Sequence, residues 1–114
     1  MDKIDMRDWI VSLETVADNK LVKWRKIPKV ENGEAVQLAW QWDQTRIALN
    51  VFWEDGKELV NMQYTSPRIS HTYSWHGLGD RTFNKVMDRL GNLAQITMHP
   101  PIDPMDFDDG RKAR

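Results

Sequence analysis

The feature that most constrains the fold is a set of hairpin turns that place apolar residues opposite one another in the middle of the chain. Asp55-Gly56 is typical of a two-residue type I′ turn, because both central residues of that turn need a positive φ. Centring a hairpin on this dipeptide makes every core-facing pair apolar: Val51 with Val60, Leu49 with Met62 and Ile47 with Tyr64.

A second turn, around Gln44-Thr45, supports the same arrangement. It pairs apolar residues again: Trp42 with Ile47, Trp40 with Leu49 and Leu38 with Val51. Because side chains alternate between the two faces of a strand, a slip of one residue would move all of them into water. The two turns therefore predict an antiparallel meander with one apolar face.

The opposite face of this meander is rich in neutral amides. It carries Gln37, Ala39, Gln41, Ala48, Asn50, Asn61 and Gln63, with Phe52 beside Leu59 at one corner. Amides both donate and accept hydrogen bonds, so they suit a peptide backbone or the edges of bases. Two interpretations stay open: an ordinary solvated face, or a face covered by a partner, by a second copy or by the chain's own tail.

The segments that flank the meander have the periodicity of amphipathic helices. The first has Asp5 as its N-cap and ends near Asp18-Asn19; its apolar face is Met6, Trp9, Ile10, Leu13, Val16 and Ala17. The second follows a further strand near residues 69–75 and begins at a capping Asp80; its apolar face is Phe83, Val86, Met87, Leu90, Leu93 and Ala94. Similar apolar stripes favour packing both helices on the apolar face of the sheet.

We therefore predict an α+β fold: a two-layer sandwich with an N-terminal helix, an antiparallel sheet of four to five strands, a C-terminal helix and a disordered tail. Residues 1–97 would form one domain, and residues 98–114 a flexible tail rich in Pro and Asp. Asn32-Gly33 predicts one more hairpin. Its register would place Lys23 and Arg25 beside Trp42 and Trp40, so we expect the turn without a full-length first strand.

Composition excludes several classes of function. The chain has no cysteine, which removes disulfides, thiol chemistry and cysteine-ligated zinc and fits a reducing cytoplasm. No stretch approaches the about 20 apolar residues that span a bilayer, and the net charge of −1 argues against a strong overall field. His71 and His76 point to opposite faces of a predicted strand, which is poor metal geometry. We expect a cytoplasmic, non-enzymatic protein without cofactor or metal.

The basic segment at residues 20–29 is a candidate for binding nucleic acid. It contains Lys20, Lys23, Trp24, Arg25, Lys26 and Lys29, with no acidic residue among them. Cations around an aromatic ring suit single strands, because the cations follow the phosphates while a base stacks on the ring. A second basic stripe, on the predicted C-terminal helix, consists of Arg81, Lys85 and Arg89. The alternative is a solvated strand edge and helix face, with Trp24 partly buried.

Near the C-terminus, Pro104-Met105-Asp106-Phe107-Asp108-Asp109 resembles the acidic C-terminal tip of bacterial single-stranded-DNA-binding proteins. The resemblance covers six residues. It implies that Phe107, flanked by acids, is a docking anchor for a protein pocket. The tip of that family ends on a terminal Phe, whereas five more residues follow here. A solubilising tail is the other interpretation of this segment.

These observations favour a small, non-catalytic protein-binding module, such as an adaptor, a chaperone-like binder or an inhibitor. Its predicted contact residues are Gln37, Gln41, Asn50, Phe52, Leu59, Asn61, Gln63 and Phe107. A homodimer through the same sheet face stays open. The alternative is a protein that binds single-stranded DNA or RNA through the basic segment at residues 20–29.

Overall fold

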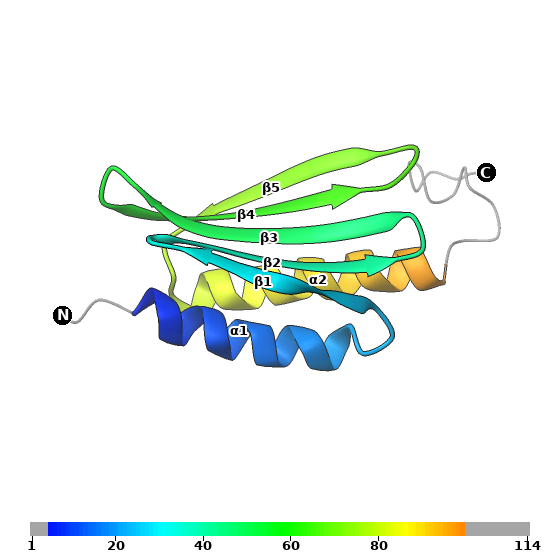
Figure 1. Cartoon of the computed structure of the whole chain (residues 1–114), viewed down its shortest axis with the longest axis horizontal. Coiled ribbons are helices and arrows are strands. Elements are labelled where there is room, and N and C mark those ends of the chain that lie inside the picture. The colour runs from blue at the N-terminus through cyan, green and yellow to red at the C-terminus, as the bar shows by residue number, and fades with distance from the viewer. Residues whose placement is uncertain (1–4, 100–114) are drawn as a thin grey trace.

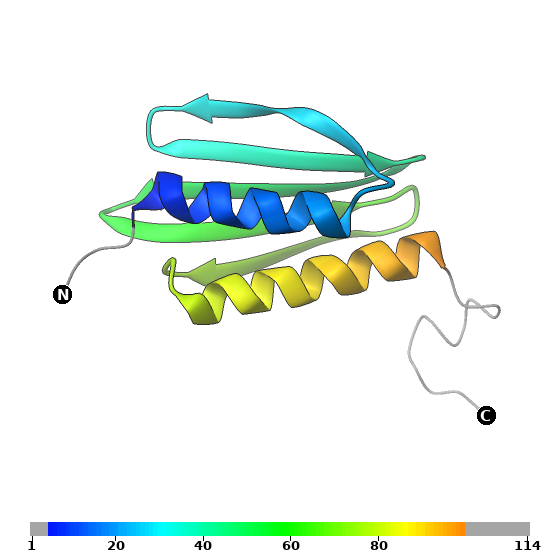
Figure 2. The ribbon, with the colours of Figure 1, turned by 90° about the horizontal axis from the view of Figure 1, so that it is seen from below.

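The computed structural model of the protein describes residues 5–99, and Figure 1 shows two helices lying on one face of a five-stranded sheet. The elements are α1 (Met6–Lys20), β1 (Arg25–Asn32), β2 (Ala35–Trp42), β3 (Thr45–Glu54), β4 (Lys57–Thr65), β5 (Ser70–His76) and α2 (Asp80–Met98). In Figure 2, α1 lies along the strands over the middle of the sheet, and α2 runs beside β5. The predicted α+β two-layer architecture is confirmed.

The helices begin close to the expected residues. Asp5 caps α1, and its Oδ1 accepts a hydrogen bond from the backbone N–H of Arg7 at 2.8 Å. α2 starts at Asp80, but its N-cap is Gly79, so the predicted capping role of Asp80 is wrong by one residue. Asp80 instead lies in the first turn, where a negative charge favours the positive end of the helix.

The five strands are antiparallel and lie side by side in chain order. The predicted register of β3 and β4 is confirmed, because Val51, Leu49 and Ile47 pair with Val60, Met62 and Tyr64. The turn between them has the positive φ values that a type I′ turn needs, 55° at Asp55 and 75° at Gly56.

The predicted register of β2 and β3 is wrong by two residues. Trp40 lies opposite Ile47, rather than Leu49, because the turn is formed by Asp43 and Gln44. Asp43 has a φ of 54°, a conformation that Asp adopts more readily than most side chains. A shift of two residues keeps every side chain on its predicted face, so the apolar face of the sheet is unchanged.

β1 is a full edge strand, which corrects the expectation of a turn without one. Its pairing with β2 shifts between Ile27 and Val30, where Pro28 cannot donate to the ladder. If the register that pairs Asn32 with Ala35 continued along the whole strand, Arg25 would lie opposite Trp42 on the core face. The shift instead places Arg25 opposite Gln41, on the face that the helices leave uncovered.

The core fills the space between the helices and the sheet. Leu13 of α1, Leu49 of β3 and Leu90 of α2 have no exposed surface, and each such side chain contributes roughly 1.5–3 kcal/mol by burial. The rings of Trp9 and Phe83 meet edge to face, with centroids 5.9 Å apart, and join the two helices. The other face of the sheet is left without a covering layer among the described residues (Figures 1 and 2).

Neither helix of residues 5–99 is long and apolar enough to cross a membrane. α2 ends at Met98, one residue beyond the expected end of the domain. The acidic segment with Phe107 lies outside the described residues, and so does the rest of the predicted tail from residue 100 onward.

Candidate functional site

The face of the sheet away from the helices carries four rows of side chains, which we call the open face. Each row takes one residue from every strand, because residues paired across an antiparallel sheet point to the same side. The rows are Arg25, Gln41, Arg46, Thr65 and Ser70; Ile27, Ala39, Ala48, Gln63 and Thr72; Val30, Gln37, Asn50, Asn61 and Ser74; and Asn32, Ala35, Phe52, Leu59 and His76.

The structure brings the predicted sheet residues together on this face. Those residues are Gln37, Gln41, Asn50, Phe52, Leu59, Asn61 and Gln63. Their grouping follows from the period of two along each strand, which the register error in β2 and β3 did not disturb.

Charge is confined to the two ends of the open face, where Glu54 and Lys57 pair beyond the last of these rows, next to the turn between β3 and β4. Arg25 and Arg46 lie in the first row, whereas the other three rows contain no Asp, Glu, Lys or Arg. In the second row, Ala39 and Ala48 are only 2% and 6% exposed although no helix covers them, because longer neighbours surround them. The centre is thus smooth and uncharged, as is typical of the core of a protein interface.

The amides of the third row are partly bonded to one another and partly free. Gln37 Nε2 donates to Asn50 Oδ1 at 2.8 Å, and Ser74 Oγ donates to Asn61 Oδ1 at 2.7 Å. Within the described part of the chain, the Nδ2 groups of Asn50 and Asn61 donate to no protein acceptor. These neighbouring donors are therefore available to acceptors of a bound molecule.

A shallow hollow of about 410 Å³ opens at one end of this row. Its lining combines apolar and amide residues: Val30, Asn32, Ala35, Val36, Gln37, Asn50, Val51, Phe52 and Asn61. The side chains of Val36 and Val51 are buried on the core face of the sheet. The small Ala35 leaves the space, and Phe52 borders it. Val30 is 55% exposed, an unusual position for a large apolar side chain. The sequence prediction missed Val30, because the pairing of β1 depends on the bulge near Pro28. It missed Ala35 because Ala35 lies opposite Phe52 only in the observed register of β2 and β3.

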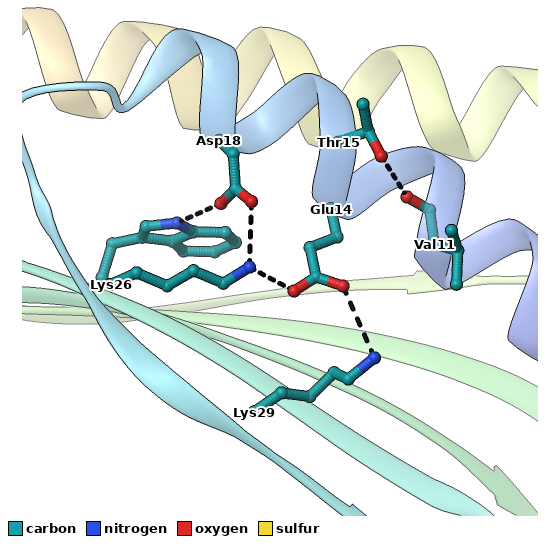
Figure 3. Close-up of polar contacts among 7 residues, drawn as sticks. Val11, Glu14, Thr15, Asp18, Lys26 and Lys29 are labelled. Atoms are coloured by element: carbon teal, nitrogen blue, oxygen red, sulfur yellow. Dashed lines mark hydrogen bonds and ion pairs between the residues drawn. The ribbon is translucent and has the colours of Figure 1, made fainter.

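The basic segment at residues 20–29 is divided among different surroundings. Figure 3 shows Lys26 Nζ between the carboxylates of Glu14 and Asp18 of α1; Lys29 Nζ lies 3.5 Å from Glu14. Asp18 also accepts a hydrogen bond from the indole Nε1 of Trp40 at 3.0 Å. These two lysines of β1 therefore tie the edge strand to α1.

The same contacts change the proton affinity of Lys26. Partial burial disfavours the ammonium and alone would lower its pKa, but the hydrogen bonds and negative charges of Glu14 and Asp18 outweigh this effect and raise the pKa. Lys26 is a charged group already committed to two carboxylates.

Trp24 is not presented to a base in this structure. It is 5% exposed, and its Nε1 donates to the sulfur of Met98 at 3.2 Å. Arg25 points to the open face and donates to Gln41 Oε1 at 2.9 Å. Lys20 and Lys23 line a groove between the C-terminal ends of the two helices. The predicted arrangement of cations around an accessible ring is therefore absent from residues 20–29.

No group of three or more His, Asp or Glu residues within residues 5–99 is placed to hold a metal ion. No protein-family model matches the chain, and neither the curated proteins nor the solved structures contain a significant match to it.

Proposed function

We propose that the protein is a non-catalytic binding module whose open face docks another protein. One observation supports this most: three adjacent rows of a solvent-facing sheet carry no formal charge and include an apolar hollow. Solvated sheet faces ordinarily carry charged side chains, whereas the centres of interfaces are depleted of them.

The chemistry of the face describes the partner that it fits. An apolar side chain of the partner fills the hollow beside Phe52, and backbone carbonyls of the partner accept from the Nδ2 groups of Asn50 and Asn61. Arg25 and Arg46, at the end of the open face opposite the Glu54–Lys57 pair, are placed to meet an acidic residue at the rim.

The uncharged rows extend roughly 20 Å in each direction, given about 4.8 Å between strands and 6.8 Å between rows. That area, about 400 Å², is half of the ~800 Å² that each partner buries in a standard interface. The partner therefore also reaches the rim, and Arg25 and Arg46 contribute to affinity as well as to orientation.

The test is a matched pair of Asn→Arg variants. Asn50→Arg places an unpaired charge in the centre of the open face, whereas Asn19→Arg places the same charge on the exposed end of α1. A partner captured by the wild-type chain is purified, and its binding to each variant is measured by calorimetry. We expect Asn50→Arg to weaken binding by roughly 2 kcal/mol or more, about 30-fold, and Asn19→Arg to leave it unchanged.

Both variants should unfold at nearly the same denaturant concentration as the wild type, because both sites face solvent in the folded chain. Equal binding by Asn50→Arg and Asn19→Arg would refute the proposal. Strong destabilisation by Asn50→Arg would show that the open face is covered within the chain. Light scattering of the wild-type protein decides whether the partner is a second copy.

A further inference from the structure

β5 carries a row of three aromatic rings on its helix-facing side. His71, Tyr73 and Trp75 alternate along the strand, with ring centroids 6.2 Å apart for the first pair and 6.4 Å for the second. β5 is an edge strand of the sheet, and α2 runs beside it in Figure 2. Tyr73 and Trp75 are half-buried and His71 is exposed, so the row is held firmly but remains accessible from the edge.

Arg89 of α2 extends this row with a stacked cation. Its guanidinium carbon lies 4.4 Å from the centroid of the Tyr73 ring. Both groups line a cavity of about 240 Å³ between the helix and the strand, together with His71. A guanidinium stacked on a ring keeps its N–H groups and its second planar face, and both are suited to phosphates and bases.

Two more cations continue the line along the helix. Lys85 and Arg81 are exposed and stand one and two turns before Arg89, about 6 Å apart along the axis. Among residues 5–99, no carboxylate lies within ion-pair distance of any of the three.

The acidic neighbour Asp88 faces away from this line. It lines the groove toward α1, on the other side of α2 from the cavity beside Tyr73. Within residues 5–99, the three cations of the stripe are therefore free of ion pairs, in contrast to Lys26 and Lys29, which are paired with Glu14 and Asp18.

We propose that this β5–α2 surface, defined by His71, Tyr73, Trp75, Arg81, Lys85 and Arg89, binds single-stranded nucleic acid. The cations contact successive phosphates, and unpaired bases stack on the row of rings. An acidic peptide would satisfy the cations but make no use of a regular row of rings. This inference is independent of the proposed function, because the helix-facing side of β5 and the open face are opposite sides of the sheet.

The test measures anisotropy of a labelled single-stranded oligothymidine and of a duplex of the same length. One double variant, Arg81→Gln with Lys85→Gln, removes two charges from the β5–α2 surface. The matched control, Lys23→Gln with Arg25→Gln, removes two charges from the basic segment at residues 20–29, away from the β5–α2 surface. All four positions are exposed, so both proteins should fold, which circular dichroism checks.

We expect the first variant to lower affinity for the single strand at least tenfold at low salt. Its slope of log K against log salt should become shallower by about 1.4, since each cation contributes ~0.7 for single strands. The control should keep the wild-type salt slope, and its affinity should fall only by the small amount that its lower net charge causes. An equal loss in both variants, no binding by the wild type, or equal affinity for duplex would overturn the proposal.

The aromatic part of the proposal has its own readout. Tyr73→Leu keeps an apolar side chain against α2 but removes the ring, and we expect at least about a fivefold loss of affinity with an unchanged salt slope. If Tyr73→Leu does not fold, the same measurement is made on His71→Ala, which removes a ring at an exposed position. Unchanged affinity in the folded variant would contradict base stacking on this row. Asn50→Arg should leave nucleic-acid binding intact, so this proposal and the open-face proposal fail independently.

Discussion

Replacing Trp24 by alanine tests whether this residue belongs to the core or is an exposed ring on which bases stack. The sequence places Trp24 among lysines, as a nucleic-acid site would, whereas in the structure its ring is 5% exposed, bonded to Met98 and 6.3 Å from the ring of Trp42. An exposed tryptophan contributes little to folding. A buried one stabilises the whole domain.

The magnitude follows from the burial. A buried tryptophan removes about 200 Å² from water, which at about 25 cal/mol per Å² is worth ~5 kcal/mol at most. Measured Trp→Ala changes in cores cost about 3–5 kcal/mol, and we expect Trp24→Ala to fall in that range. Because a domain of this size is stable by only about 5–14 kcal/mol, the variant would remain folded but close to its limit.

Urea unfolding followed by far-ultraviolet circular dichroism measures this loss. With a urea slope of about 1–3 kcal/mol per molar, the midpoint should fall by roughly 1–5 M. Lys23→Ala, the exposed neighbour, should stay within about 0.5 kcal/mol of the wild type. A loss below about 1 kcal/mol for Trp24→Ala, with an unchanged slope, would show that Trp24 is not part of the core.

Two further predictions concern the turns and the ion pairs. Gly56→Ala should lower the unfolding free energy by about 1–2 kcal/mol, since its φ of 75° disfavours any side chain. Gly91→Ala should raise the unfolding free energy by about 0.5–1 kcal/mol, because the position is helical and the new Cβ would meet only the Lys20 side chain, at 3.8 Å or more. If the unfolding midpoints of both glycine variants shifted in the same direction from the wild type, these two predictions would be contradicted. Because the folded-state pKa of Lys26 is raised, its ion pairs stabilise the fold fully below the unfolded-state value of about 10.4, and this stability is lost as pH rises through the folded value. The stability difference between wild type and Lys26→Met should therefore shrink between pH 8 and pH 11.5, and a constant difference would refute the assigned role.

The faces of the strands were predictable from the sequence, but one register was not. Asp55-Gly56 fixes β3 against β4 because that dipeptide suits only one tight turn. For β2 and β3, Trp40 meets an apolar residue at either register, Ile47 or Leu49, so apolar matching cannot detect a shift of two. Only the turn chemistry decides it.

The first strand depended on a local irregularity that periodicity does not reveal. Pro28 suggested an edge, yet only the bulge decides that Arg25 faces the open side while Lys26 faces α1. The ion pairs of Lys26 with Glu14 and Asp18 join segments that are distant in sequence, and they follow from that same bulge.

The candidate surfaces were foreseen in part. The amides of the open face could be assigned because the period of two fixes their side of the sheet. The hollow beside Phe52 could not, since it needs Val30 and Ala35 in register. The meeting of Arg89 with Tyr73 also escaped prediction: a helical pattern shows which face of α2 is apolar, but not which strand the helix lies beside.

The most direct test of the open-face account is the solvent accessibility of two side-chain amides. In nuclear magnetic resonance spectra, the Nδ2 signals of Asn50 and Asn61 should be broadened by a soluble paramagnetic gadolinium chelate in the free protein, as the signal of the exposed Asn19 is. On adding the partner, we predict that the signals of Asn50 and Asn61 become protected while that of Asn19 stays broadened. The claim that the partner docks on the open face would be contradicted if the chelate failed to broaden the Asn50 and Asn61 signals in the free protein. It would also be contradicted if the chelate still broadened the signals of all three asparagines in the complex.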